Sequence, residues 1–445
     1  MSSFVKIVFL FGLLLIATEA SAQKIQQITT YYDSLSVMPK EVYFIIDGDS
    51  NMVEGDYKKY YDSGELMAKG KFEKGAEQGT FQMYYPNGDL MRTTNFKKGL
   101  RTGKTIIYSE SGKIIQEGTF ISDTLEGKLT LYYGDGQLKS ETDFIKGKPD
   151  GVVTEYFTDG KVAQRIMYKT GKPNGITERF YKNGQLKTKE YYVNGDLNGA
   201  FITYYPNGQI ETEFTNIAGK KSGTFKNYDQ KGNLLLEGYY DKGQLSGENI
   251  SYYASGKIKT ARFYENGFLN GEVLTYDESG QLTNKTIYSE KGQNKDESVY
   301  YPTGELKATR YLGGDRPEGE WKVFYKSGAL KELANYSNGF LQGESYTYFE
   351  NENIELLTLY QAGKKTGVET HYYPDETVKS TQVYKFGKKQ GEYTAFHPNG
   401  KTAVKGLYSG NMKVEDWQYY NENGTLIKTE KYYRNKLQET IDHRK

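Results

Sequence analysis

Few residues in this sequence could do chemistry. It contains three histidines and no cysteine, which excludes cysteine-based zinc sites and thiol catalysis. The segment 47–51 begins with alternating carboxylates like a calcium loop, but Met52 occupies the position of the sharp-turn glycine and Lys58 that of the bidentate glutamate. An ordinary acidic turn is therefore the favoured interpretation. The sequence predicts no metal site, no cofactor and no enzyme active site.

A second set of polar residues lies where the pattern of the chain is broken. Glu352 and Glu376 stand where glycine is otherwise found, and His371 and His397 fall nearby on one predicted face in successive copies of a repeat. A glutamate in a left-handed turn position costs about 1 kcal/mol or more. One interpretation is a turn that has drifted to another type, with incidental histidines. The alternative is a partner-specific patch formed by these four residues.

The most regular candidates for binding are aromatic. Directly after an invariant aromatic position, a second position is aromatic in eleven of sixteen copies of the repeat. Exposed rows of tyrosine can stack on sugars or dock a protein segment. The structural alternative is cross-strand packing that stiffens a thin sheet. The candidate partner-binding residues are Tyr61, Tyr85, Tyr133, Phe157, Tyr181, Tyr205, Tyr253, Tyr301, Tyr325, Phe349 and Tyr373.

These residues belong to a 24-residue repeat that keeps its register without an insertion from position 64 to position 424. Glycine marks one turn of each copy, and a second turn has the pattern Gly-x-x-x-Gly, as in Gly99 to Gly103. Tyrosine, phenylalanine and glycine dominate the composition, with 43, 21 and 50 residues, and this mixture favours strands and turns. We therefore predict an all-β fold, an elongated antiparallel sheet of tandem β-hairpin repeats that forms a solenoid-like ribbon.

The loop Pro86-Asn87-Gly88 indicates how each hairpin is paired. Proline suits the first position of a three-residue loop and glycine suits the last, left-handed position. Under that loop Tyr84 pairs with Leu90, and strict alternation then places Tyr84, Leu90 and Phe96 on one face. This arrangement predicts a continuous ridge of aromatic and aliphatic side chains along the sheet.

The rest of the chain divides around this array. Residues 1–22 are typical of a signal peptide, because the apolar run 7–17 is too short to span a bilayer and is followed by the small residues Ala20-Ser21-Ala22. Residues 23–54 form an N-terminal segment with a half-repeat cap, residues 55–438 an array of about sixteen copies, and residues 439–445 a polar tail. We expect an exported protein that is periplasmic, associated with the outer envelope or secreted.

The charges exclude one class of partner. The 58 basic and 57 acidic residues nearly cancel and are interspersed, so no basic stripe exists to neutralise a phosphate backbone. We expect no nucleic-acid partner. No apolar stretch after the leader is long enough to predict a transmembrane segment in the mature chain, while contact with lipid or glycan stays open.

The segment Tyr192-Val193-Asn194-Gly195-Asp196-Leu197-Asn198-Gly199 carries the pattern Tyr-x-x-Gly-x-x-x-Gly and resembles the MORN repeat. The added half Tyr-Tyr-x-Asn-Gly-x-Leu resembles the bacterial variant called MORN_2, or the YwqK-type antitoxin repeat, over roughly residues 55–438. Resemblance to MORN arrays implies an extended antiparallel sheet that serves as a protein scaffold, and sometimes as a lipid-associating surface. Resemblance to YwqK-type proteins implies an immunity component of a toxin–antitoxin module.

Three functions are consistent with these features. The leading hypothesis is an exported, non-enzymatic scaffold that binds a protein partner, whose identity the sequence does not give. The first alternative is an antitoxin or immunity protein that neutralises a toxin. The second is a cell-surface glycan-binding array. The sequence has only two tryptophans, Trp321 and Trp417, which argues against this function.

Overall fold

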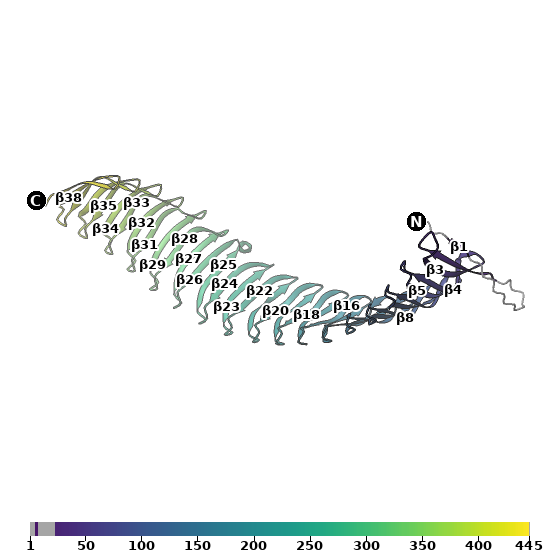
Figure 1. Cartoon of the computed structure of the whole chain (residues 1–445). Coiled ribbons are helices and arrows are strands. Elements are labelled where there is room, and N and C mark those ends of the chain that lie inside the picture. Colours follow the sequence, from purple (N-terminus) through teal and green to yellow (C-terminus); the bar gives the residue numbers. More distant parts are fainter. Residues whose placement is uncertain (1–4, 8–22, 445) are drawn as a thin grey trace. The chain divides into compact units, whose positions relative to one another are not determined.

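The computed structural model describes residues 5–7 and 23–444. The chain divides into two units, Met1–Lys220 and Lys221–Lys445. In each unit the strands follow one another in chain order as antiparallel hairpins, as Figure 1 shows. The predicted signal peptide, residues 1–22, lies outside the described residues except for Val5–Ile7, and so does residue 445 of the predicted tail.

The strands of the first unit are β1 (Val5–Ile7), β2 (Ile25–Tyr31), β3 (Pro39–Ile46), β4 (Asp49–Tyr60), β5 (Leu66–Glu73), β6 (Ala76–Tyr84), β7 (Leu90–Lys97), β8 (Leu100–Tyr108), β9 (Ile114–Ile121), β10 (Thr124–Leu125), β11 (Gly127–Tyr132), β12 (Leu138–Ile145), β13 (Lys148–Pro149), β14 (Gly151–Tyr156), β15 (Val162–Lys169), β16 (Lys172–Phe180), β17 (Leu186–Val193), β18 (Asp196–Tyr204) and β19 (Ile210–Ile217).

The second unit begins within β20 and contains β20 (Lys220–Tyr228), β21 (Leu234–Asp241), β22 (Gln244–Tyr252), β23 (Ile258–Glu265), β24 (Phe268–Tyr276), β25 (Leu282–Ser289), the 3-10 turn η1 (Glu290–Gly292), β26 (Asn294–Tyr300), β27 (Leu306–Gly313), β28 (Arg316–Phe324), β29 (Leu330–Ser337), β30 (Phe340–Leu341), β31 (Gly343–Tyr348), β32 (Ile354–Gln361), β33 (Lys364–Tyr372), β34 (Val378–Lys385), β35 (Lys388–Phe396), β36 (Thr402–Ser409), β37 (Met412–Tyr420), β38 (Leu426–Tyr433) and β39 (Lys436–Asp442). The predicted all-β class is confirmed.

Each copy of the repeat is a hairpin with the predicted three-residue loop. Tyr84 pairs with Leu90, and the Tyr85 N–H donates a hydrogen bond to the Asp89 carbonyl at 2.8 Å. The Gly88 N–H donates to the Tyr85 carbonyl at 2.9 Å, and Gly88 has a φ of 88°. That left-handed conformation costs glycine little because it has no β-carbon, which explains the regular recurrence of glycine at this position.

A β-bulge directly after the loop corrects one sequence prediction. Tyr84 pairs with Leu90, but Met83 pairs with Arg92, so one extra residue is inserted on β7. Beyond the bulge Gly79 lies opposite Phe96. Since side chains alternate along β6, Phe96 lies on the face opposite to Tyr84. The prediction that Tyr84, Leu90 and Phe96 share one face was therefore wrong.

The sheet consequently has two distinct faces. We call the face of Phe81, Thr94, Phe96 and their equivalents the core face, and the face of Thr80, Tyr84, Asn95 and their equivalents the open face. The pairs Phe81–Thr94 and Thr80–Asn95 lie directly opposite each other across the hairpin, which fixes this assignment.

The core face is packed by large side chains set against small ones. The rings of Phe81 and Phe96 meet edge to face with centroids 5.3 Å apart, and Phe81 is 9% exposed. A β-carbon placed on Gly70 would lie 2.5 Å from the Phe81 ring. Phe225 lies against Gly238 in the same way in the second unit. Glycine at this core-face position thus leaves room for an aromatic ring on the neighbouring strand.

The second turn of each repeat is attached to the turn before it. The Gly99 N–H donates to the carbonyl of Glu77, 22 residues earlier, at 2.9 Å. The neighbouring Lys98 N–H donates to the Gln78 side-chain oxygen at 3.1 Å. Equivalent bonds recur along both units, so backbone and side-chain acceptors join this edge of the sheet from copy to copy.

Candidate functional site

The eleven predicted partner-binding residues, which we call the aromatic column, make a repeated contact between hairpins of the sheet. The Tyr85 hydroxyl donates a hydrogen bond to the Tyr108 carbonyl of the next copy at 2.8 Å. Tyr61, Tyr133, Tyr181, Tyr253, Tyr301, Tyr325 and Tyr373 do the same, each over 23 residues. All eleven candidates, including Phe157, Tyr205 and Phe349, are half-buried. The column therefore joins successive hairpins at the first-turn edge.

A lysine covers the exposed side of many of these rings. The Lys187 amine lies 5.6 Å from the centre of the Tyr181 ring, and Lys379 lies at the same distance from Tyr373. Lys187 and Lys379 are the residues that the β-bulges insert. At exposed sites such a cation–π contact contributes about 0.5–1 kcal/mol. Hydroxyl and ring are both engaged, which supports the packing interpretation. A binding role for the column stays a prediction.

The four residues of the predicted irregular patch do not form one site. Glu352 and Glu376 adopt φ values of 70° and 66°. Their N–H groups donate to the carbonyls of Phe349 and Tyr373 at 3.0 and 2.9 Å. The turn glycines of the other copies make the same hydrogen bond. The idea of a turn of another type was wrong, since glutamate occupies the unchanged turn. Within residues 5–7 and 23–444, no hydrogen bond or ion pair joins any two members of the patch.

The two histidines of that patch have separate partners. Nε2 of His371 lies 3.5 Å from a carboxylate oxygen of Glu369 on the core face. The His397 ring nitrogen lies 3.0 Å from the Tyr420 carbonyl, so His397 replaces a tyrosine of the aromatic column and keeps its contact. One further tyrosine makes the same contact and was not predicted. The Tyr32 hydroxyl donates to the Tyr60 carbonyl at 2.8 Å, although Tyr32 precedes the 24-residue register.

Buried carboxylates on the core face are partnered within the sheet. Glu190 is 5% exposed, is paired with Arg179 and accepts a hydrogen bond of 2.7 Å from Tyr192. Burial of Glu369 opposes its ionisation, but the bonded and charged Lys365 outweighs this and lowers the pKa of the carboxyl. These groups satisfy one another within the sheet.

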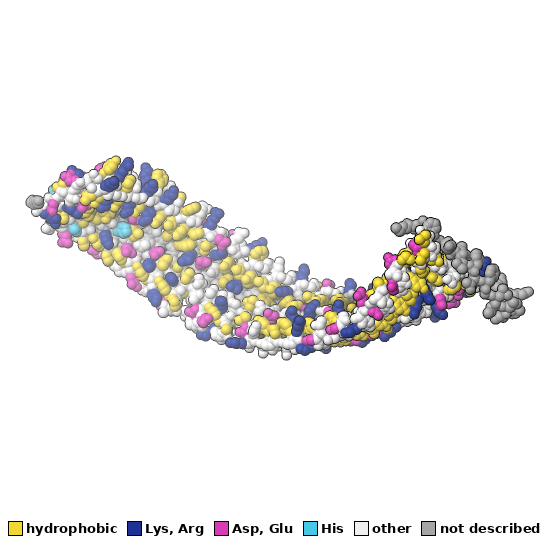
Figure 2. Space-filling model, in the orientation of Figure 1, with side chains coloured by type: hydrophobic (Ala, Val, Ile, Leu, Met, Phe, Trp, Pro, Cys, Tyr) yellow, Lys and Arg dark blue, Asp and Glu magenta, His cyan; other side chains and the backbone are white. Residues whose placement is uncertain are grey.

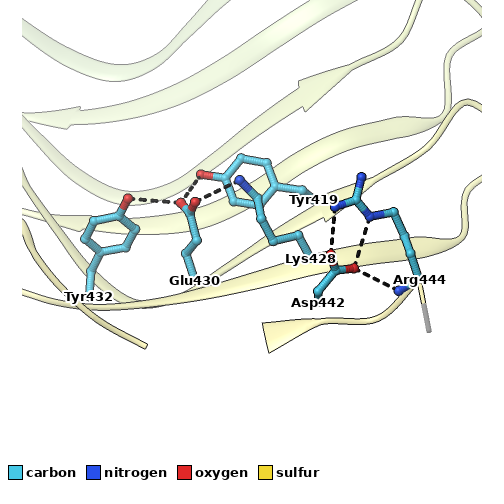
Figure 3. A network of polar contacts seen from close by, with 6 residues as sticks. All are labelled: Tyr419, Lys428, Glu430, Tyr432, Asp442 and Arg444. Carbon is cyan, nitrogen blue, oxygen red and sulfur yellow. Dashed lines mark hydrogen bonds and ion pairs between the residues drawn. The ribbon is translucent and has the colours of Figure 1, made fainter. Parts of the chain in front are cut away.

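The clearest such network lies near the end of the second unit (Figure 3). The Glu430 carboxylate accepts hydrogen bonds from Lys428, Tyr419 and Tyr432 at 2.8, 2.6 and 3.0 Å. The bond from Lys428, then that from Tyr419, lowers the pKa of Glu430 to about 2. Burial raises the pKa of Tyr419, and the bond to Glu430 adds to the rise. The cluster holds β37 and β38 together on the core face.

The open face carries the exposed apolar side chains. On β14 to β17, Val152 lies opposite Met167 and Ile176 opposite Tyr191, and these four are 45%, 43%, 40% and 44% exposed. We call these four residues the apolar stripe. Further exposed apolar residues on the open face of the first unit are Leu100, Ile121, Ile145, Val193 and Ile217. Figure 2 shows apolar side chains at the surface among charged ones.

The apolar stripe continues into a hollow on the same face. Met167 lies over Gly175, whose absent side chain leaves space for the thioether, and Tyr191 lies over Gly199 in the same way. The hollow measures about 470 Å³ and is lined by Ile176, Lys189, Glu190, Tyr191, Asn198, Gly199, Ala200, Ile202 and Tyr204. The sequence did not indicate the stripe or the hollow, because the repeat positions of Val152 and Met167 are occupied by polar residues in many copies.

Two cations beside the stripe are paired within the chain. Lys128 lies 3.1 Å from Glu141, and Arg165 lies 3.8 Å from Glu178. These two cations therefore have counter-charges on neighbouring strands of the same sheet.

No group of three or more potential metal ligands occurs among the described residues. The Asp47 carboxylate instead accepts the Lys24 N–H at 2.9 Å, and Asp49 accepts the Asn51 N–H at 2.9 Å, as in a polar turn. In the part of the chain that the structure describes, no helix is long and apolar enough to span a bilayer.

A family model for the MORN_2 repeat, described as a MORN repeat variant, matches eleven segments that together cover more than half of the chain: 53–74, 77–98, 101–122, 125–146, 149–170, 173–194, 197–215, 245–267, 269–290, 317–338 and 389–409. The chain belongs to the MORN_2 family. Most MORN_2 matches begin near the second turn and end at the next one, so each spans one strand–loop–strand hairpin.

The MORN_2 hairpin also occurs where the family model does not match. Segment 341–362 contains Glu352 in place of the turn glycine, and segment 365–386 contains Glu376, yet both keep the strand pairing of the matched copies. The structure thus extends the MORN_2 array through residues that have lost its sequence signature.

Other comparisons add little to the MORN_2 assignment. No curated protein matches the chain. A Photorhabdus luminescens Tc holotoxin pore is 12% identical, with 92% of this chain and 29% of that chain covered and a TM-score of 0.13. A TcdB2-TccC3 crystal structure is 11% identical, with 92% and 35% covered and a TM-score of 0.11. This chain spans about a third of the length of these chains.

Proposed function

We propose that this MORN_2 chain is an exported, non-enzymatic repeat scaffold that binds a protein partner through the open face of its first unit. The observation that carries the proposal is the apolar stripe Val152, Met167, Ile176 and Tyr191, which is exposed on consecutive hairpins. Contiguous exposed apolar surface marks interaction sites on proteins. Aromatic and methionine side chains are enriched at such sites.

The chemistry of the stripe favours an apolar protein segment as its partner. The ion pairs Lys128–Glu141 and Arg165–Glu178 neutralise four of the charges beside it. The hollow next to Tyr191 can receive a side chain from a partner, which a flat surface cannot do. On this account the core face maintains the sheet, and the open face makes the contact.

Capture from an envelope extract of the cells that make the protein tests this proposal. The native chain is compared with the double variant Met167→Glu/Tyr191→Glu. The matched control is Thr119→Glu/Asn335→Glu, which introduces the same charges at the equivalent repeat position in two polar copies. We expect the native chain and the control to retain the same proteins and the stripe variant to lose at least one. Identical retention by all three would contradict the proposal.

The alternative functions remain predictions with their own tests. A toxin-like reading frame beside the gene would favour the YwqK-type immunity function. Binding of an isolated envelope glycan, lost when Tyr85, Tyr133 and Tyr205 are together changed to serine, would favour the glycan-binding function. Loss of a captured protein in that triple variant, with the fold retained, would assign partner binding to the aromatic column instead of the apolar stripe.

A further inference from the structure

We infer that the partner of the apolar stripe is a second copy of this chain, packed open face against open face. The inference rests on the proposed function, because it names the protein that the same surface binds. Two sheets that pack face to face lie about 10 Å apart and bury the side chains of both inner faces. One unit has only its core face packed, so a second copy would supply the missing layer for the open face.

The repeat itself favours a copy of the chain over an unrelated protein. The pairs Val152–Met167 and Ile176–Tyr191 lie on successive hairpins, so they are about 10 Å apart. A second copy related by a two-fold axis presents the same ridges at the same spacing. Ridges of one copy then fall between ridges of the other along the stripe. An unrelated surface would match this period only by accident.

The area available is sufficient for a stable dimer. From β11 to β19 the sheet has roughly eight strand rows, which at about 4.8 Å each gives about 38 Å along the sheet. Strands of eight residues are about 26 Å long, so the open face here covers about 1,000 Å². A standard protein interface buries about 800 Å² per partner. The exposed residues Ile145, Val193 and Ile217 widen the apolar area beyond the stripe.

Charge does not oppose the contact of two identical faces. A two-fold interface sets each surface against itself, so unpaired like charges would repel. Lys128 and Arg165 each have a carboxylate of the same chain within 3.8 Å. The hollow of about 470 Å³ beside Tyr191 would receive a stripe side chain of the other copy. The face thus combines apolar ridges, two internally paired cations and a recess.

Sedimentation velocity over a series of protein concentrations tests the inference. We expect the native chain to shift from the mass of one chain to that of two as concentration rises. The variant Met167→Glu/Tyr191→Glu should stay at the mass of one chain, with an unchanged β-sheet circular dichroism spectrum. The control Thr119→Glu/Asn335→Glu should dimerise like the native chain. A native chain that stays monomeric throughout, or a stripe variant that dimerises normally, would overturn the inference.

A gentler substitution keeps the test decisive if the charged variant does not fold. The chain has no cysteine, so Met167→Cys introduces a single thiol. We expect its alkylation rate to fall at dimer-forming concentrations, and that of Thr119→Cys, introduced separately, to stay constant. Equal behaviour of the two thiols would overturn the inference. If the native chain is monomeric but the stripe variant loses a protein in the capture experiment, only the dimer inference fails. If the chain is monomeric and the stripe variant retains every captured protein, the proposed function fails too.

Discussion

Trp417 lies so close to Gly406 that a β-carbon on the glycine would overlap the indole ring. Trp417 is 2% exposed and also contacts the Tyr393 and Tyr408 rings. The backbone of Gly406 is not left-handed, so its conformation does not require glycine. Glycine is needed at this position because it leaves space for the indole ring. This relationship shows how one glycine lets the neighbouring strand bury the largest side chain of the core face.

The first prediction concerns that space. Gly406→Ala should destabilise the second unit by about 1–3 kcal/mol, because the added carbon forces the packed indole to move. The measurement is the free energy of unfolding in urea, followed by tryptophan fluorescence. Gly313→Ala is the control, since Gly313 lies in the same unit and a β-carbon there would stay at least 3.9 Å from its nearest neighbours. Equal effects of the two substitutions would show that the ring contact does not matter.

The second prediction concerns the aromatic column. Tyr181→Phe keeps the ring but removes the hydroxyl that donates to the Tyr204 carbonyl at 2.7 Å. We expect a loss of about 0.5–1.5 kcal/mol in the free energy of unfolding. Tyr191→Phe is the matched control, because that ring is 44% exposed on the open face. If both variants unfold at the same urea concentration, the hydroxyls do not join the hairpins.

The third prediction concerns pH. Since the pKa of Glu430 is lowered from 4.5 to about 2, its ionised form stabilises the fold above pH 4.5, and this stability is lost as the pH falls towards 2. Glu430→Gln should therefore be less stable than the native chain by about 1–3 kcal/mol at neutral pH. The difference in unfolding free energy between the two proteins, measured by urea titration, should become smaller between pH 4.5 and pH 2. A difference that does not change with pH would refute this role.

The fourth prediction concerns the irregular turns. Glu352 holds a φ of 70°, which glycine adopts without strain. Glu352→Gly should stabilise its hairpin by up to about 1 kcal/mol. Glu350→Gly, in the same loop but without a positive φ, should not stabilise it. Hydrogen exchange of the β31 and β32 amides measures both changes. Faster exchange in Glu352→Gly would mean that the glutamate side chain has a role that the turn geometry does not reveal.

Much of this fold could be predicted from the residues. The period, the loop Pro86-Asn87-Gly88 and the pairing of Tyr84 with Leu90 follow from turn chemistry, which is local. The bulge could not be predicted, because the residue that it inserts is polar or apolar in different copies and changes no spacing in the sequence. A single inserted residue nevertheless moves Phe96 to the other face.

The candidate site was less predictable than the fold. The aromatic column has a strong sequence signal because it joins hairpins in most copies, as Tyr85 does with Tyr108. The apolar stripe has a weak signal, because Val152 and Ile176 share their repeat position with polar residues such as Thr80. Regularity in a repeat marks what each copy needs for folding. A binding surface can occupy only some copies, and exposure in the structure is needed to find it.

Hydroxyl-radical footprinting of the unmodified chain tests most directly whether the open face of the first unit meets another protein. Met167 and Tyr191 are 43% and 44% exposed and are reactive residue types, while Tyr433 in the second unit is 63% exposed and serves as the internal reference. We expect oxidation of Met167 and Tyr191 to fall in the bound or associated state and oxidation of Tyr433 to stay unchanged. Unchanged oxidation of Met167 and Tyr191 in that state would contradict it.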